Sequence, residues 1–128
     1  MTIFRSSALL AAFGIAATTA SANVLIPMSP AEKLKQAGFV AIVTPADCPA
    51  PRKADFYEPC TLSVVEMIKG ESATSITFNR SNGIAEAHVD CCQASRRYLV
   101  YLQRGNGQWW SVNGRYGVLD LDRQGKMQ

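Results

Sequence analysis

Four cysteines are the residues of this sequence with the clearest capacity for chemistry. They are Cys48, Cys60, Cys91 and Cys92. An even number of cysteines in a short chain that reaches an oxidising compartment predicts two disulfides, and three pairings are open. A direct Cys91–Cys92 bridge strains the peptide between the two residues and is therefore easily reduced. We expect two long-range bridges that join the segment between Cys48 and Cys60 to Cys91 and Cys92, with the partner of each left open.

A zinc site is the alternative for the same region. The possible donors are His88, Asp90, Cys91 and Cys92. Structural zinc sites mostly use cysteine pairs that are separated by two to four residues, so that the side chains converge on one tetrahedron. Adjacent cysteines lack that spacing. We therefore expect no metal and no cofactor, and we place His88 on a strand face.

Two catalytic alternatives have less support. A thiol-redox role for Cys91 and Cys92 lacks the Cys-x-x-Cys motif at a helix start that lowers a thiolate pKa. A hydrolase needs a nucleophile beside His88, and the candidate serines lie in no nucleophile motif. These serines are Ser81, Ser95 and Ser111. Asp120 and Asp122 alternate along one strand face, as solvated carboxylates do. We therefore expect a chain that is not an enzyme, with a small exported enzyme or thiol-redox protein as the alternative.

The first 22 residues have the layout of a secretory signal. Arg5 is followed by an apolar stretch over residues 8–17 and then by an Ala-x-Ala triplet that ends at Ala22. The apolar stretch is too short to cross roughly 30 Å of hydrocarbon. We expect cleavage after Ala22 and a periplasmic or secreted mature chain of 106 residues with no membrane span.

The charge distribution argues against nucleic acid as a partner. The mature chain has 12 Lys and Arg residues against 10 Asp and Glu residues, and both signs are scattered from Glu32 to Lys126. Binding to a phosphate backbone requires clustered basic residues, which a net charge of +2 spread in this way does not provide. A chain of this length can nevertheless bury a core of its own.

A short helix is predicted near the start of the mature chain. Its N-terminal capping box consists of Ser29, Pro30 and Glu32. Leu34 and Ala37 supply an apolar side, and Gly38 suits a left-handed C-cap. A helix of this length is stable only when it packs on other elements.

Apolar runs predict most of the strands. They cover residues 39–44, 61–68, 75–78, 97–102 and 109–112. We expect the first strand to end at Pro45, and the second to contain a bulge or two-sided burial at Val64 and Val65. The residues from 45 to 59 form a proline-rich loop. Residues 84–95 fit either a weak strand or a turn of helix.

The strongest turn signal is Asn113-Gly114, because both residues accept the positive φ angles of a type I′ turn. It predicts a hairpin with one strand before it and one after it. Neighbouring strand residues point to opposite faces, so one of Trp109 and Trp110 must point inward. Tyr116 is then either their cross-strand partner or part of a binding surface.

These elements predict an all-β chain with one short helix, folded as a small antiparallel barrel or sandwich. A closed barrel leaves no edge strand exposed. We assign a single domain to residues 23–122, preceded by the signal at residues 1–22 and followed by a polar tail at residues 123–128.

Residues 38–104 resemble the netrin-like domain. The similar segments are FVAIV at 39–43, VVEMIKG at 64–70, ITF at 76–78 and RYLVYL at 97–102, with cysteine before the last. That family includes tissue inhibitors of metalloproteinases and bacterial secreted proteins, so the resemblance implies a five- to six-stranded antiparallel OB-like Greek-key barrel. In the inhibitors an amino-terminal cysteine chelates the protease zinc. Here the first cysteine, Cys48, is internal, and we do not expect that mechanism.

The sequence thus predicts an exported, non-catalytic binding module that disulfides stabilise. Its expected partner is a protein, a glycan or a small molecule of the exported compartment. OB-type barrels bind through one strand face and the loops beside it. The candidate binding surface consists of Trp109, Trp110, Tyr116, Arg52 and Lys53.

Overall fold

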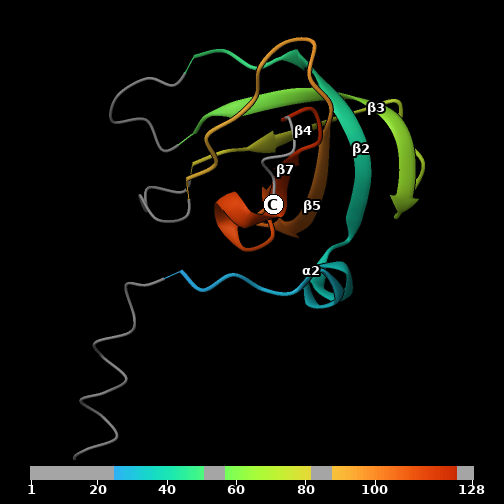
Figure 1. The fold of residues 1–128 in the computed structure, drawn as a ribbon, viewed down its shortest axis with the longest axis vertical. Helices are drawn as coiled ribbons and strands as arrows, with labels where there is room; N and C mark the ends of the chain where they lie inside the picture. Colours follow the sequence, from blue (N-terminus) through green and yellow to red (C-terminus); the bar gives the residue numbers. More distant parts are fainter. Residues whose placement is uncertain (1–24, 51–56, 82–87, 124–128) are drawn as a thin grey trace, which may run out of the picture.

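The computed structural model describes residues 25–50, 57–81 and 88–123. In these residues the long strands β2 and β3 curve around the shorter strands, and α2 lies at one end (Figure 1). The elements are α2 (Pro30–Gln36), β2 (Phe39–Asp47), β3 (Pro59–Lys69), β4 (Ser75–Asn79), β5 (Tyr98–Gly105), β6 (Gln108–Ser111), the 3-10 helix η2 (Gly114–Gly117) and β7 (Val118–Asp120). No helix in the described ranges is long and apolar enough to cross a membrane. The predicted signal at residues 1–22 lies outside these ranges.

The sheet closes on itself into a five-stranded barrel. Its strand order is β2-β3-β4-β6-β5, with β5 pairing back to β2, and β7 adds to β5 as a sixth strand. The predicted all-β, OB-like barrel is confirmed. The expectation of antiparallel pairing throughout is wrong at one seam, where β4 and β6 are parallel with Phe78 opposite Trp109. Strand directions cannot alternate all the way around a closed ring of five, so one pair must be parallel.

Helix α2 begins as predicted, but it ends and packs differently. Ser29 and Glu32 form the capping box, and Pro30 is the first helical residue. The helix ends at Gln36 and its C-cap residue Ala37 is extended, so Gly38 is not a left-handed cap. Leu34 is exposed, and Lys33 takes the buried position instead. Its Nζ lies 4.9 Å from the Tyr101 ring centre and donates to the Tyr116 carbonyl at 2.6 Å, while burial lowers the Lys33 pKa.

Strand β2 continues through Pro45, where the sequence predicts its end. Pro45 pairs with Leu62 of β3, and the strand stops two residues later at Asp47. On its other side β2 pairs with β5 only from Phe39 to Val43. The strand is therefore unpaired on one edge at Pro45, which is where proline is tolerated in a sheet.

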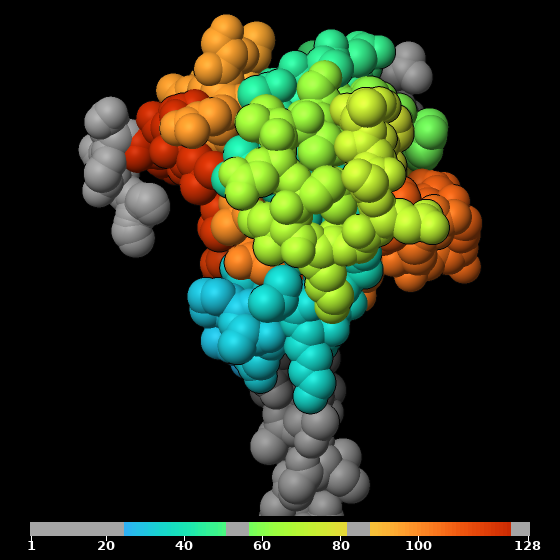
Figure 2. All heavy atoms as spheres, turned by 90° about the vertical axis from the view of Figure 1, so that its right-hand side faces the viewer, coloured from blue at the N-terminus to red at the C-terminus, as the bar shows by residue number. Residues whose placement is uncertain are grey.

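Of the two alternatives for Val64 and Val65, a bulge or two-sided burial, the structure has the bulge. Val64 pairs with Val43 and Glu66 pairs with Ile42, so Val65 is the extra residue. A second shift leaves Ile68 extra. Both bulged residues point outward, and Val65 is 58% exposed. Bulges bend a strand, which fits the curved course of β3 in Figure 1. Figure 2 shows the atoms of this strand above those of α2.

The predicted hairpin at Asn113-Gly114 is wrong, although both residues do have positive φ angles. The chain enters η2 there, and β7 then pairs with β5 rather than with β6. Strand β6 has no free edge for it, because β4 and β5 occupy both sides. The two-residue turn instead joins β5 to β6 at Asn106 and Gly107, whose φ angles are 51° and 75°.

Side chains inside the barrel form the main core. Its fully buried members include Val43, Cys60, Leu62, Val100 and Leu102. A second cluster of buried residues lies outside the barrel wall. It consists of Ala37, Val40, Tyr101 and Val112. Strand β5 contributes to both clusters, so it is buried on both of its faces.

Two glycines separate the cost of a strained backbone from the cost of a steric clash. Gly70 has a φ of +106°, and an added Cβ would lie 2.5 Å from the Gly38 carbonyl oxygen. Gly107 has a φ of +75° with no atom within 4 Å of an added Cβ. We expect Gly70→Ala to lower the free energy of unfolding by about 3 kcal/mol and Gly107→Ala by about 1 kcal/mol. Denaturant unfolding measures both, and equal losses would contradict the close approach of Gly70 to Gly38.

Candidate functional site

The disulfides are Cys48–Cys60 and Cys91–Cys92, so the two predicted long-range bridges are wrong. Cys48 directly follows β2 and Cys60 lies near the start of β3, where Asp47 pairs with Thr61. The antiparallel ladder therefore brings these two cysteines together, with Cα atoms 4.1 Å apart. The bridge closes the base of the proline-rich loop, which is held by its own two ends.

The two disulfides nevertheless lie against each other. Cys60 Sγ is 3.9 Å from Cys92 Sγ, which is van der Waals contact between sulfurs of different bridges. The Sγ atoms of Cys48, Cys60 and Cys92 all lie within 4.8 Å of one another. The segments that the sequence predicts to be joined are thus in contact without a covalent bond between them.

Arg80 connects the loops around this sulfur cluster. Its side chain is buried, with 3% of the residue exposed, and it donates to three backbone carbonyls. Nη2 donates to Pro49 at 2.6 Å, Nη1 to Cys91 at 2.7 Å and Nε to Glu58 at 3.3 Å. Burial lowers the Arg80 pKa, while Glu58 and Asp90 act against that shift. Sequence reasoning missed Arg80, because an arginine after a strand and before a turn-rich segment is typical of the surface.

His88 and Glu58 form a hydrogen bond at the edge of the same region. His88 Nε2 lies 2.9 Å from a carboxylate oxygen of Glu58, whose side chain is buried. His88 lies in a segment without regular structure rather than on the expected strand face. Among the described residues, the donor atoms that converge closely enough for a metal are those of Cys48, Cys60 and Cys92, a different set from the zinc donors considered above.

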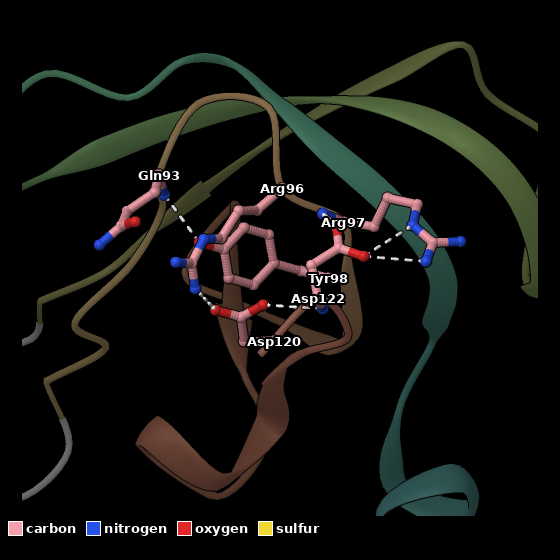
Figure 3. Close-up of polar contacts among 6 residues, drawn as sticks. All are labelled: Gln93, Arg96, Arg97, Tyr98, Asp120 and Asp122. Carbon is pink, nitrogen blue, oxygen red and sulfur yellow. Dashed lines mark hydrogen bonds and ion pairs between the residues drawn. The ribbon is translucent and has the colours of Figure 1, made fainter. Parts of the chain in front are cut away.

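Two arginine–aspartate pairs join Asp120 of β7 and Asp122 to the residues just before β5 (Figure 3). Arg96 Nη1 lies 2.6 Å from Asp120, and Arg97 donates to Asp122 from its backbone N–H at 2.7 Å and from Nη2 at 2.9 Å. The Arg97 hydrogen bonds hold the Asp122 pKa below its usual value of 3.8. Asp120 and Asp122 are therefore ion-paired rather than simply solvated.

These groups surround a cleft of about 1230 Å³, which we call the cysteine cleft. Its walls include Cys91, Cys92, Arg96, Tyr98, Arg115 and Asp120. Tyr98 is 4% exposed, and its hydroxyl accepts a 2.7 Å hydrogen bond from the Gln93 N–H. Arg115 lies over the Tyr116 ring and donates to the Tyr116 hydroxyl at 3.0 Å. In the described part of the chain, no carboxylate pairs with Arg115.

The predicted aromatic surface is divided between two places. Trp109 packs against the main core, with its ring centre 5.9 Å from that of Phe39, and the Arg104 guanidinium lies over its ring. Trp110 donates to the Gly105 carbonyl at 2.8 Å and lines a smaller cleft of about 500 Å³. Tyr116 lies in η2 and is not their cross-strand partner. The other two predicted surface residues, Arg52 and Lys53, lie outside the described residues.

Removing the Arg80 side chain should destabilise the whole fold. Arg80→Ala leaves the Pro49 and Cys91 carbonyls without their donor and removes the positive charge that acts on the buried Glu58, so we expect the free energy of unfolding to fall by about 3 kcal/mol. Arg80→Lys should not restore it, because one ammonium cannot reach all three carbonyls. Arg104→Ala, which removes an exposed arginine, should cost about 1 kcal/mol or less. Urea unfolding compares the three variants, and a small effect of Arg80→Ala would contradict the role of Arg80.

The Arg97–Asp122 pair should give a stability contribution that depends on pH. Because the Asp122 pKa is lower in the folded chain, the contribution is complete above 3.8 and is lost as the pH falls through the folded-state pKa. An NMR titration of the Asp122 carboxyl should show this low value. Arg97→Gln should return it toward 3.8, and Arg104→Gln should leave it unchanged. Titration at the usual value in the unaltered chain would contradict the pairing.

A functional argument for this chain depends on the geometry of this region, because comparisons with known proteins found no match. No protein-family model matches the chain, and neither a curated protein nor a solved structure matches it. The netrin-like resemblance therefore stays a prediction. The features available to a functional argument are an OB-like barrel, two adjacent disulfides and a cleft lined by arginines and a buried tyrosine.

Proposed function

We propose that this chain is an exported, non-catalytic binding module that holds its ligand in the cysteine cleft. Export to the periplasm or beyond the cell is supported by the signal-like residues 1–22 and by the two disulfides. The barrel supports the proposal because OB-type barrels carry their ligands on a strand face and the adjoining loops. Netrin-like character is part of the proposal, without the zinc-chelating terminus of the inhibitors.

The observation that carries the proposal is the presence of two available donors in one cleft. The buried Tyr98 hydroxyl accepts from Gln93, and among the described residues its own hydrogen has no acceptor. The Arg115 guanidinium, which is exposed, bonds only a neutral hydroxyl in the same part of the chain. Both residues line the cysteine cleft. Two hydrogen-bond donors, one of them cationic, favour a ligand with an anionic acceptor group.

A carboxylate is the group that best fits these donors. Arginine binds carboxylates through two parallel hydrogen bonds, and a hydroxyl donor adds a third. Acidic glycans, peptide termini and small organic acids all carry this group, so the three partner classes expected from the sequence share the chemistry that would be recognised. Asp120 and Asp122 are already paired with arginines, which favours binding over acid–base chemistry in this cleft.

Chemical-shift mapping with carboxylate probes tests the proposed function. Acetate, succinate, glucuronate and acidic dipeptides are titrated into the labelled mature chain, and we expect the shifts to concentrate on Gln93, Tyr98 and Arg115. Arg115→Ala should weaken the best probe about tenfold or more, because it removes a charged hydrogen bond.

Arg104→Ala is the matched control, since Arg104 is also an exposed arginine beside an aromatic ring but lines the smaller cleft. It should leave the affinity unchanged. Shifts that centre on Trp110 and Gln103 instead would move the binding site to the smaller cleft. Equal effects of the two arginine variants would contradict recognition by Arg115.

A further inference from the structure

We propose that the four cysteines form a thiol–disulfide exchange site, in which reduction of Cys91–Cys92 allows Cys92 to attack Cys60 and release Cys48. This activity goes beyond the binding of a ligand and does not depend on it. The short contact between Cys60 and Cys92, which belong to different disulfides, is the observation that carries it.

The geometry selects one sulfur of the Cys91–Cys92 bridge. Cys92 Sγ lies 3.9 Å from Cys60 Sγ and belongs with Cys48 and Cys60 to a group of sulfurs within 4.8 Å of one another. Cys91 Sγ does not belong to that group. A thiolate on Cys92 therefore starts beside the neighbouring disulfide and must turn into line with the Cys48–Cys60 bond to displace Cys48, whereas Cys91 Sγ lies outside this group.

Burial sets the order of events. Cys91 and Cys92 are half-buried and line the cysteine cleft, which is open to solvent. Cys60 is completely buried. A dithiol from solution can therefore attack Cys91–Cys92 directly, whereas Cys60 is reached from within the protein through Cys92. The outer disulfide is the entry point for electrons, and after the exchange the two thiols are Cys91 and Cys48.

Each step of the exchange balances. A dithiol reductant transfers two electrons and two protons to Cys91–Cys92, which becomes two thiols, and the reductant leaves as a disulfide. Cys92 then loses its proton to solvent, and its thiolate attacks Cys60 Sγ. The Cys60–Cys92 bond forms as the Cys48–Cys60 bond breaks. Cys48 leaves as a thiolate that takes a proton from solvent.

Arg80 holds the backbone on both sides of the sulfurs. Its guanidinium donates to the carbonyl of Cys91 and to that of Pro49, the residue after Cys48. The same side chain therefore keeps the segments that carry the two disulfides against each other. Asp90 and Glu58 are the nearby negative charges that act on Arg80.

The exchange would move a covalent constraint. Cys48–Cys60 closes the base of the proline-rich loop, whereas Cys60–Cys92 joins β3 to the segment that forms a wall of the cysteine cleft. The loop would then be released at one end while the cleft wall becomes tied to the barrel. The two connectivities are thus two states of the same site, selected by the redox conditions.

Two single variants form a matched test. In the mature protein purified under oxidising conditions, Cys91→Ser leaves Cys92 as the odd thiol, and Cys92→Ser leaves Cys91. After incubation at pH 8 with EDTA, free thiols are alkylated. Trypsin then places Cys48, Cys60 and Cys92 on separate peptides, residues 36–52, 54–69 and 81–96. We expect a Cys60–Cys92 cross-link and alkylated Cys48 in the first variant. In the second we expect an intact Cys48–Cys60 bridge and alkylated Cys91.

An intact Cys48–Cys60 bridge with alkylated Cys92 in the Cys91→Ser variant would overturn the proposal. Equal exchange in both variants would also overturn it, since that pattern indicates scrambling in the unfolded chain. If near-ultraviolet circular dichroism shows that a variant has not folded, the unaltered chain is instead treated with one equivalent of dithiothreitol and its free thiols are alkylated. Alkylation of Cys48 and Cys91 then supports the exchange, and alkylation of Cys91 and Cys92 refutes it.

Discussion

The buried guanidinium of Arg80 is the interaction on which one whole end of the barrel depends. The segments around it are rich in proline or lack regular structure, so they satisfy few of their own backbone groups. Arg80 supplies donors to carbonyls before β3, after β2 and before β5, and thereby joins segments that are far apart in the sequence. Burying a charge is costly unless its hydrogen bonds are made, so these contacts form together or not at all. The contact between the disulfides and the shape of the cysteine cleft follow from that arrangement.

Local patterns predicted most of the elements. The capping box at Ser29 and the bulge at Val65 each depend on neighbouring residues alone, and the structure has both. The number of strands predicted a barrel or a sandwich, and the netrin-like resemblance favoured the barrel that the structure has. Lys33 shows the limit of this reasoning: it is buried because an aromatic ring and a carbonyl from distant segments meet it, and no pattern within the helix signals that.

The wrong predictions of the hairpin and of the disulfides share a cause. Strand pairing depends on the whole sheet, whereas the turn residues and the spacing of the cysteines are local features. Asn106-Gly107 and Asn113-Gly114 carry similar turn signals, but only the first joins paired strands, because β6 has both edges occupied. Likewise, Cys48 meets Cys60 because of the register between β2 and β3, which sequence spacing cannot specify. The candidate site was missed for the same reason. Tyr98, Arg80 and Arg115 come from different segments, and their proximity exists only in the folded barrel.

The parallel seam between β4 and β6 has a consequence for how the chain folds. β4 ends at Asn79 and β6 begins at Gln108, so the seam cannot form until the intervening residues and β5 are in place. Contacts between residues so distant in sequence slow folding, because the loop between them must close first. A chain synthesised from its amino terminus therefore keeps the β2-β3-β4 sheet open until β5 and β6 are available. If the chain crosses a membrane unfolded, as residues 1–22 predict, this delay would help to keep it in a form that can be threaded through a narrow channel.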